Sequence, residues 1–287
     1  MNKPPFITLS DNNKIPQLGY GVYMIETDEE TEKCVSYALK VGYRHIDTAH
    51  AYRNERGVGA AIKKSGIPRE EIFITSKLFT TDFGEGKTSI AIDQMLKRLD
   101  TNYIDLLLIH VPYGDYLSAW KEMEKGVKDG KIKSIGISNF ETENIDEIYS
   151  KATIKPVIDQ IELHPYCQHV ELRKKFDKLN IKIEGFCPLT HAETNLLKED
   201  FILKCAEKYK KSPAQIVLRW HIQSGFIVIP KSVREEKIKE NFEIFDFELS
   251  KEDFEEINKL DGKVKRIQDF KELEELSNEI NKQGMFD

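Results

Sequence analysis

Eight short β-rich runs alternate with helical segments along the chain, and this alternation limits the possible folds more than any other feature. Several runs are continuously apolar, which is typical of strands buried on both faces of a parallel sheet. The runs are QLGYGVY (17–23), GYRHID (42–47), IFITSK (72–77), IDLLLIH (104–110), SIGISN (134–139), VIDQIEL (157–163), IKIEGFCP (181–188) and FIVIPKS (226–232). Eight such units in 287 residues predict a closed (β/α)8 barrel, the TIM barrel of the α/β class.

A doubly wound open sheet is the alternative for alternating strands and helices. That fold has a glycine-rich phosphate-binding turn after its first strand, with the pattern G-x-G-x-x-G. The corresponding segment here, GYGVYMIETDE, lacks this pattern. The sequence therefore favours the closed barrel.

Capping signals mark the ends of the predicted helices. Thr27 and Glu30 form a capping-box pattern before TEKCVSYALK, and Gly42 follows this helix. Ser212 and Gln215 form a second capping box, with Pro213 at the first helical position of SPAQIVLRW. These signals place helices between the predicted strands.

Both ends of the chain carry elements beyond the eight units. FITLSDNNKIP (6–16) predicts a hairpin that turns at DNN and covers one end of the barrel. Residues 261–287 form a polar tail in which apolar spacing predicts one more helix, on Phe270, Leu273, Leu276 and Ile280. No Pro/Gly/Ser-rich linker divides the chain, so residues 1–287 are expected to form a single domain.

The charge balance argues against nucleic-acid and membrane-surface partners. The chain has 43 basic and 49 acidic residues and a net charge of -6, so no bulk field attracts polyanions. Its N-terminus lacks the apolar core of a signal peptide, and no apolar run is long enough to span a bilayer. The cysteines show no C-x-x-C pairing, which is typical of reduced thiols. We expect a cytoplasmic protein with a small-molecule partner.

The stretch HIDTAHAYRNE, residues 45–55, contains the first candidate site residues, Asp47 and Tyr52. Their separation of five fits neither helical neighbours nor one face of a strand. The two side chains meet only if the strand ends near Asp47 and the chain turns back. A barrel supplies that geometry, because the carboxyl ends of its strands share one face with the loops that follow them.

Other polar residues end the neighbouring predicted strands at the same face. Strand three ends at Lys77, strand four at His110, and strand five at Ser138 and Asn139. We therefore predict that Asp47, Tyr52, Lys77 and His110 converge at this end of the barrel, although they span 63 residues of sequence, from 47 to 110.

The four converging residues suit proton transfer to a carbonyl oxygen. A free tyrosine has a pKa of about 10, which a nearby ammonium such as Lys77 lowers. Asp47 would keep Lys77 protonated and in place, and His110 would hydrogen-bond a substrate oxygen. No Ser or Cys nucleophile lies beside a base, so the group is not expected to attack a carbonyl. One His and one Asp are too few ligands for zinc, so no metal site is predicted.

At these residues the sequence resembles the aldo-keto reductase family. The matching segments run in order from about Gly19 to Leu260 and are GYRHIDTAHAYRNE, ITSKL, YIDLLLIHVP, SIGISNF, DQIELHPY and VIPKSV. The resemblance implies a (β/α)8 barrel that binds NADP(H) across its carboxyl-end face. It also implies hydride transfer to an aldehyde or ketone, with Tyr52 as proton donor, tuned by Asp47 and Lys77, and His110 orienting the carbonyl.

The resemblance also assigns cofactor-binding positions. Ser138, Asn139 and Gln160 match the side chains that hold the nicotinamide carboxamide, and Phe186 matches the aromatic residue stacked on its ring. The adenosine-phosphate end matches Lys231, Ser232, Arg234, Lys237, Glu240 and Asn241. Cations beside a ribose 2′-phosphate favour NADPH over NADH.

The chain departs from the family pattern at several cofactor and pocket positions. Phe186 stands where Tyr is commoner, and Cys187 and Thr190 replace Ser and Gly of the pyrophosphate loop. Lys237 stands where Arg is usual, and a lysine cannot make the bidentate contact with phosphate that an arginine makes. Val111 replaces a frequent Trp after the catalytic His and is expected to reshape the pocket. The tail lacks the usual GPDP-like run.

The predicted function is NADPH-dependent reduction of aldehydes or ketones to alcohols. The expected pocket walls are Tyr23, Phe79, Val111 and Tyr113, from loops after strands one, three and four. One alternative is a non-catalytic NADPH-binding sensor or regulatory subunit on the same barrel. Another is a hydrolase that pairs Asp47 with a second carboxylate, for which Glu162 is the nearest candidate. The substrate stays open, and a monomer is expected.

Overall fold

The computed structural model describes residues 4–192, 194–264, 275 and 278–279. Eight parallel strands form its central sheet, in the order β10-β9-β8-β7-β6-β5-β4-β3. The strands are β3 (Tyr20–Gly21), β4 (His45–Asp47), β5 (Phe73–Leu78), β6 (Ile104–Ile109), β7 (Ile132–Ser138), β8 (Ile158–Glu162), β9 (Lys182–Phe186) and β10 (Ile227–Val228). Neighbours in the sheet are neighbours in sequence, as repeated strand-helix units require.

Backbone hydrogen bonds join the first and last strands and close the sheet into a barrel. Leu18, just before β3, forms a parallel bridge with Val228 in β10. Gly19 N donates to Val228 O at 2.9 Å, and Gly21 N donates to Pro230 O at 3.2 Å. The predicted closed barrel is therefore confirmed.

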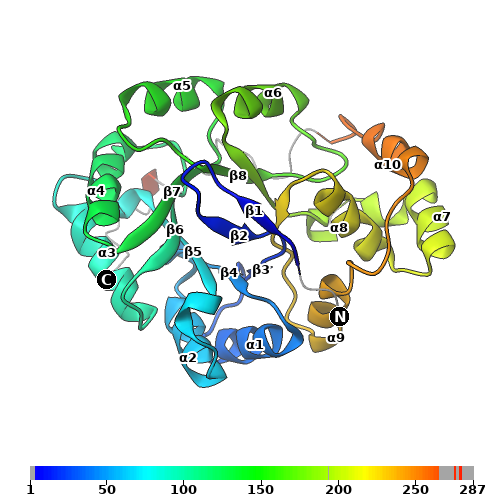
Figure 1. The fold of residues 1–287 in the computed structure, drawn as a ribbon, viewed down its shortest axis with the longest axis horizontal. Helices are drawn as coiled ribbons and strands as arrows, with labels where there is room; N and C mark the ends of the chain where they lie inside the picture. Colours follow the sequence, from blue (N-terminus) through cyan, green and yellow to red (C-terminus); the bar gives the residue numbers. More distant parts are fainter. Residues whose placement is uncertain (1–3, 193, 265–274, 276–277, 280–287) are drawn as a thin grey trace.

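The helices surround this barrel, as Figure 1 shows with the strands near the centre. They are α1 (Asp28–Val41), α2 (Glu55–Ser65), α3 (Lys87–Arg98), α4 (Tyr116–Lys128), α5 (Thr142–Lys151), α6 (Val170–Leu179), α7 (Asp200–Tyr209), α8 (Pro213–Gln223), α9 (Glu235–Phe242) and α10 (Lys251–Asn258). Short 3-10 turns add His50–Tyr52, Arg69–Glu71, Thr80–Asp82, Thr190–Ala192 and Leu196–Lys198. No helix within the described residues has the length and apolarity needed to cross a bilayer.

The capping signals place the helix starts correctly. The Thr27 side chain accepts a hydrogen bond from Glu30 N at 3.1 Å, and Gly42 caps the other end of α1 with φ 129°. At α8 both halves of the box form: Ser212 accepts from Gln215 N, and the Gln215 side chain accepts from Ser212 N. Each contact satisfies a backbone donor that the first turn leaves unpaired.

The first and last strands are shorter than predicted. QLGYGVY and FIVIPKS each give only two strand residues, in β3 and β10. Pro230 has no backbone N–H to donate, which ends regular pairing after β10. Four other strand ends differ from the prediction by one residue. Strand β5 continues past Lys77 to Leu78, whereas β6, β7 and β8 end one residue early, at Ile109, Ser138 and Glu162.

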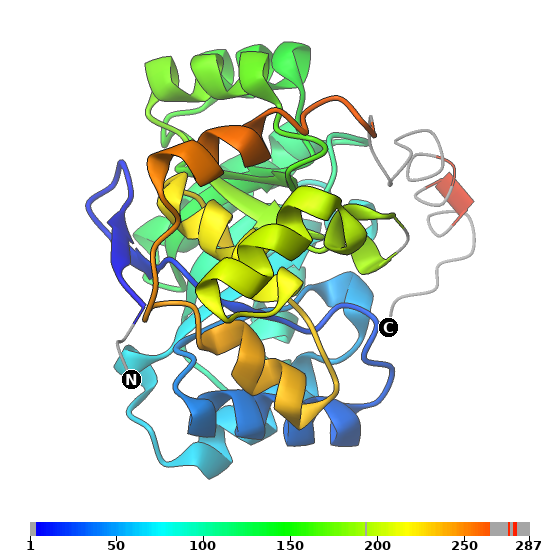
Figure 2. The ribbon, with the colours of Figure 1, turned by 90° about the vertical axis from the view of Figure 1, so that its right-hand side faces the viewer.

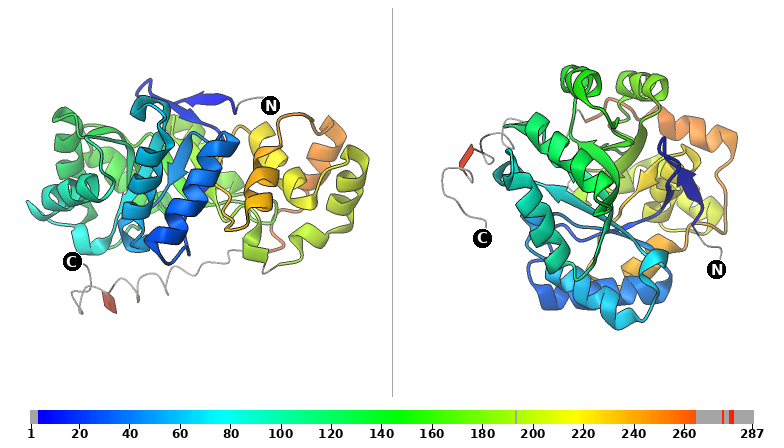
Figure 3. Two further views of the ribbon diagram at one scale, coloured as in Figure 1. Left: turned by 90° about the horizontal axis from the view of Figure 1, so that it is seen from below. Right: turned by 60° about the vertical axis from the view of Figure 1, so that its left-hand side comes forward.

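The predicted hairpin forms and closes the amino-terminal end of the barrel. Strands β1 (Phe6–Thr8) and β2 (Lys14–Pro16) pair antiparallel, and Asn12 N donates to Leu9 O in the turn. Leu9 and Ile15 pack in one cluster with the first residues of three strands, Phe73, Ile158 and Ile227. The hairpin crosses the barrel centre in Figure 1, and Figures 2 and 3 place it at one end of the molecule.

Replacing Ile15 by alanine is expected to destabilise the chain by about 2–5 kcal/mol, because Ile15 is fully buried under the barrel floor. Urea unfolding followed by circular dichroism would measure the change. Phe6→Ala is the control, because 61% of Phe6 in the same hairpin is exposed and its loss leaves no internal cavity. Equal effects of the two substitutions would show that the hairpin does not plug the barrel.

The predicted helix of the C-terminal tail lies outside the described residues, at Phe270, Leu273, Leu276 and Ile280.

Candidate active site

The carboxyl ends of the strands bring Asp47, Lys77, Tyr52 and His110 together, as the sequence predicts. Asp47 ends β4, and Tyr52 ends the 3-10 turn His50–Tyr52 just after it. Arg53 follows in the left-handed region with φ 57°, so the chain reverses over the barrel mouth, meaning the end with the strand carboxyl termini. This reversal carries the Tyr52 ring back over the strand that bears Lys77.

Lys77 is the centre of the group and is fully buried. Its Nζ donates to Asp47 Oδ1 at 2.6 Å and to Thr48 O at 2.9 Å, and lies 5.0 Å from the centroid of the Tyr52 ring. Burial is the largest single influence and lowers the pKa of Lys77, but the charge and hydrogen bond of Asp47, with Tyr52 and Glu184, together outweigh it, and the net direction is upward. Burial raises the pKa of Asp47 while Lys77 opposes the rise. The pair is ionised, because the pKa of Lys77 is raised and its Nζ lies 2.6 Å from the Asp47 carboxylate.

The structure changes one expectation about Tyr52. Lys77 does lower the pKa of Tyr52, through its charge and a hydrogen bond, but burial outweighs this and raises the pKa to about 12. The predicted net lowering is therefore wrong. Tyr52 stays protonated across the physiological pH range and is always ready to donate.

His110 lies beside Tyr52 as a neutral ring. The ring centroids are 5.7 Å apart with an interplanar angle of 75°. Burial first, and the Lys77 charge second, hold the pKa of His110 well below its usual range. Its Nδ1 is buried without a hydrogen-bond partner among the described residues, so we place the single ring proton on Nε2. A neutral imidazole can orient a carbonyl oxygen, whereas Tyr52 is the better proton source.

The predicted carboxamide-binding residues adjoin this group. Ser138 Oγ donates to Gln160 O at 2.9 Å, and Asn139 Nδ2 donates to Ser138 Oγ and to His110 O, both at 3.1 Å. Gln160 Nε2 donates to Asp47 Oδ2 at 2.8 Å. The amide protons are thus used inside the protein, while no hydrogen bond from the described residues reaches Asn139 Oδ1 or Gln160 Oε1. Two such oxygens suit the two protons of a carboxamide NH₂ group.

The pyrophosphate-loop departures coincide with unusual backbone. Phe186 ends β9 and is half-buried. Cys187 and Thr190 have φ of 53° and 57°, in the left-handed region that favours glycine and strains a β-branched residue. Such a backbone suits the Gly that the family resemblance leads us to expect at position 190. Thr190 compensates with a 2.7 Å contact between its hydroxyl and that of Thr194.

The predicted adenosine-phosphate residues gather around the start of α9. Arg234 caps the helix, and its backbone N donates to Ser232 Oγ at 3.2 Å. Lys231 is exposed and its Nζ donates to Met24 O at 3.1 Å, across the mouth from the loop after β3. Lys237 pairs with Glu240 at 2.5 Å, and Asn241 is buried one residue later. The exposed cations at a helix N-terminus suit a phosphate group.

Two of the four predicted pocket walls contact the central group directly. The Tyr23 ring lies 5.0 Å from that of Tyr52, and the Phe79 ring 5.6 Å from that of His110. Val111 is buried and Tyr113 half-buried in the loop after β6. These two stay predictions.

The structure adds residues that the sequence did not indicate. The Glu184 carboxyl is fully buried and accepts from Gln160 Nε2 at 3.0 Å. His50 Nδ1 lies 2.8 and 2.9 Å from the two Asp82 carboxylate oxygens, which ties the loops after β4 and β5 together. His191 packs edge-on to Tyr23, with ring centroids 6.5 Å apart. His50 lies within HIDTAHAYRNE, and Glu184 is the charged residue of the predicted strand IKIEGFCP.

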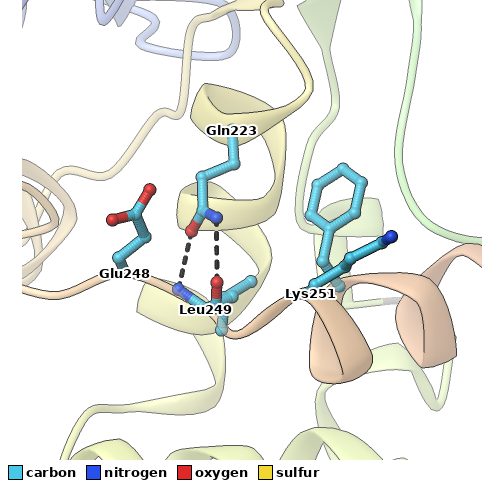
Figure 4. Close-up of a pocket in the computed structure, with 5 residues that line it drawn as sticks. Gln223, Glu248, Leu249 and Lys251 are labelled. Carbon is cyan, nitrogen blue, oxygen red and sulfur yellow. Dashed lines mark hydrogen bonds between the residues drawn. The ribbon is translucent and has the colours of Figure 1, made fainter.

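A surface hollow elsewhere on the barrel is separate from this site. Figure 4 shows it between α8 and α10, lined by Gln223, Glu248, Leu249, Lys251 and Phe254. The Gln223 amide is used up on the Leu249 backbone, with contacts of 2.7 and 3.1 Å. None of the predicted site residues lies in it. The described residues also contain no group of three or more His, Cys, Asp or Glu that could hold a metal ion.

Comparisons with known proteins agree with this geometry. The profile of the Aldo/keto reductase family matches residues 17–262. The chain is 44% identical over 255 residues to the glyoxal reductase of Bacillus subtilis (strain 168), covering 88% of this chain and 92% of that protein. It is also 44% identical over 264 residues to the methylglyoxal reductase DkgA of Escherichia coli (strain K12), covering 91% and 95%.

A solved structure gives the same result for the fold. The aldo-keto reductase of Bombyx mori, in complex with NADP, superposes with a TM-score of 0.88 at 33% identity, covering 95% of this chain and 97% of that one. These matches argue against the hydrolase alternative. Glu162, its candidate second carboxylate, has its Oε1 3.0 Å from His164 Nε2. The predicted reductase class and its NADP(H) cofactor are confirmed. The chain belongs to the aldo/keto reductase family and is an oxidoreductase that acts on carbonyl groups.

Proposed function

We propose that this protein reduces small α-dicarbonyl compounds, such as glyoxal and methylglyoxal, with NADPH, and that Tyr52 delivers the proton. Two relatives at 44% identity carry the names glyoxal reductase and methylglyoxal reductase. The aromatic rings of Tyr23 and Phe79 stand directly beside Tyr52 and His110, which suits a small substrate. The observation that carries the mechanism is the Lys77 ammonium, buried against both Asp47 and the Tyr52 ring.

Each residue then has one role in the reaction. When bound, the nicotinamide supplies a hydride to the carbonyl carbon. Asn139 and Gln160 hold its carboxamide through their free amide oxygens. His110 donates from Nε2 to the carbonyl oxygen and orients it. Tyr52 gives its phenolic proton to that oxygen as negative charge develops there, and Lys77 stabilises the phenolate that remains.

The test of the proposed function is NADPH oxidation with a panel of methylglyoxal, an aromatic aldehyde and an aldose. We expect the highest kcat/KM with methylglyoxal. A preference for the aldose would overturn the substrate class. Tight NADPH binding without turnover on any carbonyl would instead support the sensor alternative.

The basic residues before α9 are proposed to select NADPH over NADH. Lys231→Ala removes an exposed cation, and we expect the KM for NADPH to rise roughly 10- to 100-fold, with the KM for NADH unchanged, because one charge-assisted contact is lost. Lys239→Ala, an exposed lysine in the last turn of α9, is the matched control. Equal changes for both cofactors would show that Lys231 does not recognise the 2′-phosphate.

We also propose that residues 1–287 form one domain that acts as a cytoplasmic monomer. Neighbouring strands pair all the way round the described barrel, and nothing in that barrel divides it. Light scattering after size-exclusion chromatography would measure the molecular mass, and a dimer mass would overturn the proposal of a monomer.

A further inference from the structure

Glu184 is a buried carboxyl group inside the barrel that the proposed mechanism does not use. It lies on β9, next to Gln160 of β8, which is its register partner across the two strands. No part of its side chain reaches solvent. A buried carboxyl group beside an active site is costly and calls for a physical reason.

The contacts of Gln160 supply that reason. Its Nε2 donates one proton to Asp47 Oδ2 at 2.8 Å and the other to Glu184 Oε2 at 3.0 Å. Both partners are acceptors, so the orientation of the amide is fixed by the hydrogen bonds. Its carbonyl oxygen points away from both carboxyl groups. That oxygen is the atom the proposed function assigns to the nicotinamide carboxamide.

The surroundings of Glu184 favour its neutral form. Its Oε1 has no hydrogen-bond partner among the described residues and lies 3.5 Å from His45 Nε2. An ionised carboxylate would leave this oxygen without a donor in the protein interior, which is strongly unfavourable. Burial, followed by the nearby Asp47 charge, raises the pKa of Glu184 to about 8.

Few other ionisable groups among the described residues face Glu184. Strand β4 presents His45 and Asp47, and β5 presents Lys77. Burial lowers the pKa of His45 to about 3, so this ring is neutral. The paired strand β10 presents Ile227, which carries no charge. Around neutral pH the charges are therefore those of Asp47 and Lys77, and they cancel.

We propose that Glu184 is a positioning residue that, together with Asp47, holds the Gln160 amide with its carbonyl oxygen free for the cofactor, and that ionising Glu184 disables the site. The inference rests on the proposed function and extends it to a residue that does not touch the substrate. An ionised Glu184 adds a second negative charge beside Asp47. That charge opposes phenolate formation at Tyr52, and it favours the cationic ring of NADP⁺ over the neutral ring of NADPH.

The main test compares pH profiles of wild type and Glu184→Gln. In wild type, kcat/KM is expected to fall about tenfold per pH unit above about pH 8, as one essential proton is lost. In Glu184→Gln, whose side chain keeps an acceptor for Gln160 but does not ionise, this fall is expected about one pH unit or more higher. Tyr52 and Lys77 titrate well above this range and do not produce the wild-type fall.

The matched control is Glu124→Gln. Glu124 is a buried carboxyl group on α4, outside the barrel, that accepts from the backbone N of Thr153 and Ile154 at 2.6 and 2.9 Å. The same chemical change there should leave the wild-type pH profile in place. A shift in both variants would show a general loss of stability and would overturn the positioning role.

A binding measurement tests the same inference without turnover. Fluorescence titration gives the Kd for NADPH and for NADP⁺ between pH 7 and 9. The ratio of the Kd for NADP⁺ to the Kd for NADPH is expected to fall as wild type passes pH 8, and to stay constant in Glu184→Gln. A ratio independent of pH in wild type overturns the inference even if the variant does not fold.

Absence of carbonyl reduction in wild type itself would sink the proposed function. An active wild type whose pH profile and Kd ratio are reproduced by Glu184→Gln would sink only the role of Glu184.

Discussion

Replacing Tyr52 by phenylalanine is expected to remove nearly all carbonyl reduction while NADPH still binds. The phenyl ring keeps its packing against Tyr23 and His110, so the loss is confined to one proton. Positioned proton transfer contributes about 10²- to 10⁴-fold to a rate, and kcat should fall by that order. NADPH oxidation measures kcat, and quenching of protein fluorescence measures the retained cofactor affinity.

Tyr103→Phe serves as the control for this substitution. Tyr103 precedes β6 at the opposite end of the barrel, where its ring contacts Arg69 and Lys133. Removing that hydroxyl should leave turnover unchanged. If Tyr52→Phe keeps full activity, the proton comes from another group and the proposed mechanism fails.

Replacing Lys77 by methionine is expected to damage both catalysis and folding. The substitution leaves the Asp47 carboxylate buried without its counter-ion, which costs about 3–5 kcal/mol in comparable sites. It also removes the cation that stabilises the Tyr52 phenolate, so kcat should fall as well. Urea unfolding would measure the free energy, and NADPH oxidation the turnover.

Lys63→Met is the matched control for Lys77→Met. Lys63 pairs with Asp100 at 2.6 Å, the same distance as the buried pair, but 76% and 59% of the two side chains are exposed. An exposed pair contributes only about 0–1 kcal/mol, so this variant should be nearly as stable as wild type. Similar losses in both variants would mean that burial does not govern the strength of the Asp47–Lys77 pair.

The loss of stability in Lys77→Met is expected to depend on pH in a definite direction. Without Lys77, only the hydrogen bond from Gln160 opposes the effect of burial on Asp47, so its pKa rises further above the unfolded value. A group with a raised folded-state pKa contributes most stability at low pH and loses that contribution as pH rises through the folded pKa. The deficit of the variant relative to wild type should therefore shrink on acidification. A deficit that grows on acidification would contradict an uncompensated Asp47 carboxylate.

The sequence predicts the barrel and the meeting of the central group for a simple physical reason. Eight apolar runs separated by capped helices leave few alternatives, and parallel strands must end on one face. Asp47, Lys77 and His110 all lie within one residue of a strand end, so errors of one residue at β5 and β6 did not matter. Tyr52 required only that the loop turn back.

The interior of the barrel was harder to predict. Whether Glu184 contacts Gln160 depends on the register between β8 and β9, and strand sequences alone do not give that register. The pKa of Tyr52 was predicted in the wrong direction because it reflects a balance between burial and the Lys77 charge. Such a balance depends on how closely neighbouring groups pack, which composition and spacing do not reveal.

The contact between His50 and Asp82 has an evolutionary consequence. Asp82 also accepts a hydrogen bond from Phe79 N at 2.8 Å. One carboxylate therefore links the 3-10 turn that bears Tyr52 to the loop that bears Phe79. A lineage that enlarged its pocket by reshaping the backbone at Phe79 would displace Tyr52 at the same time. Tyr23 lies on the loop after β3, which the Asp82 carboxylate does not link to the other two loops. New substrate ranges are therefore more accessible through mutations at Tyr23 and its neighbours than through changes that move the backbone at Phe79.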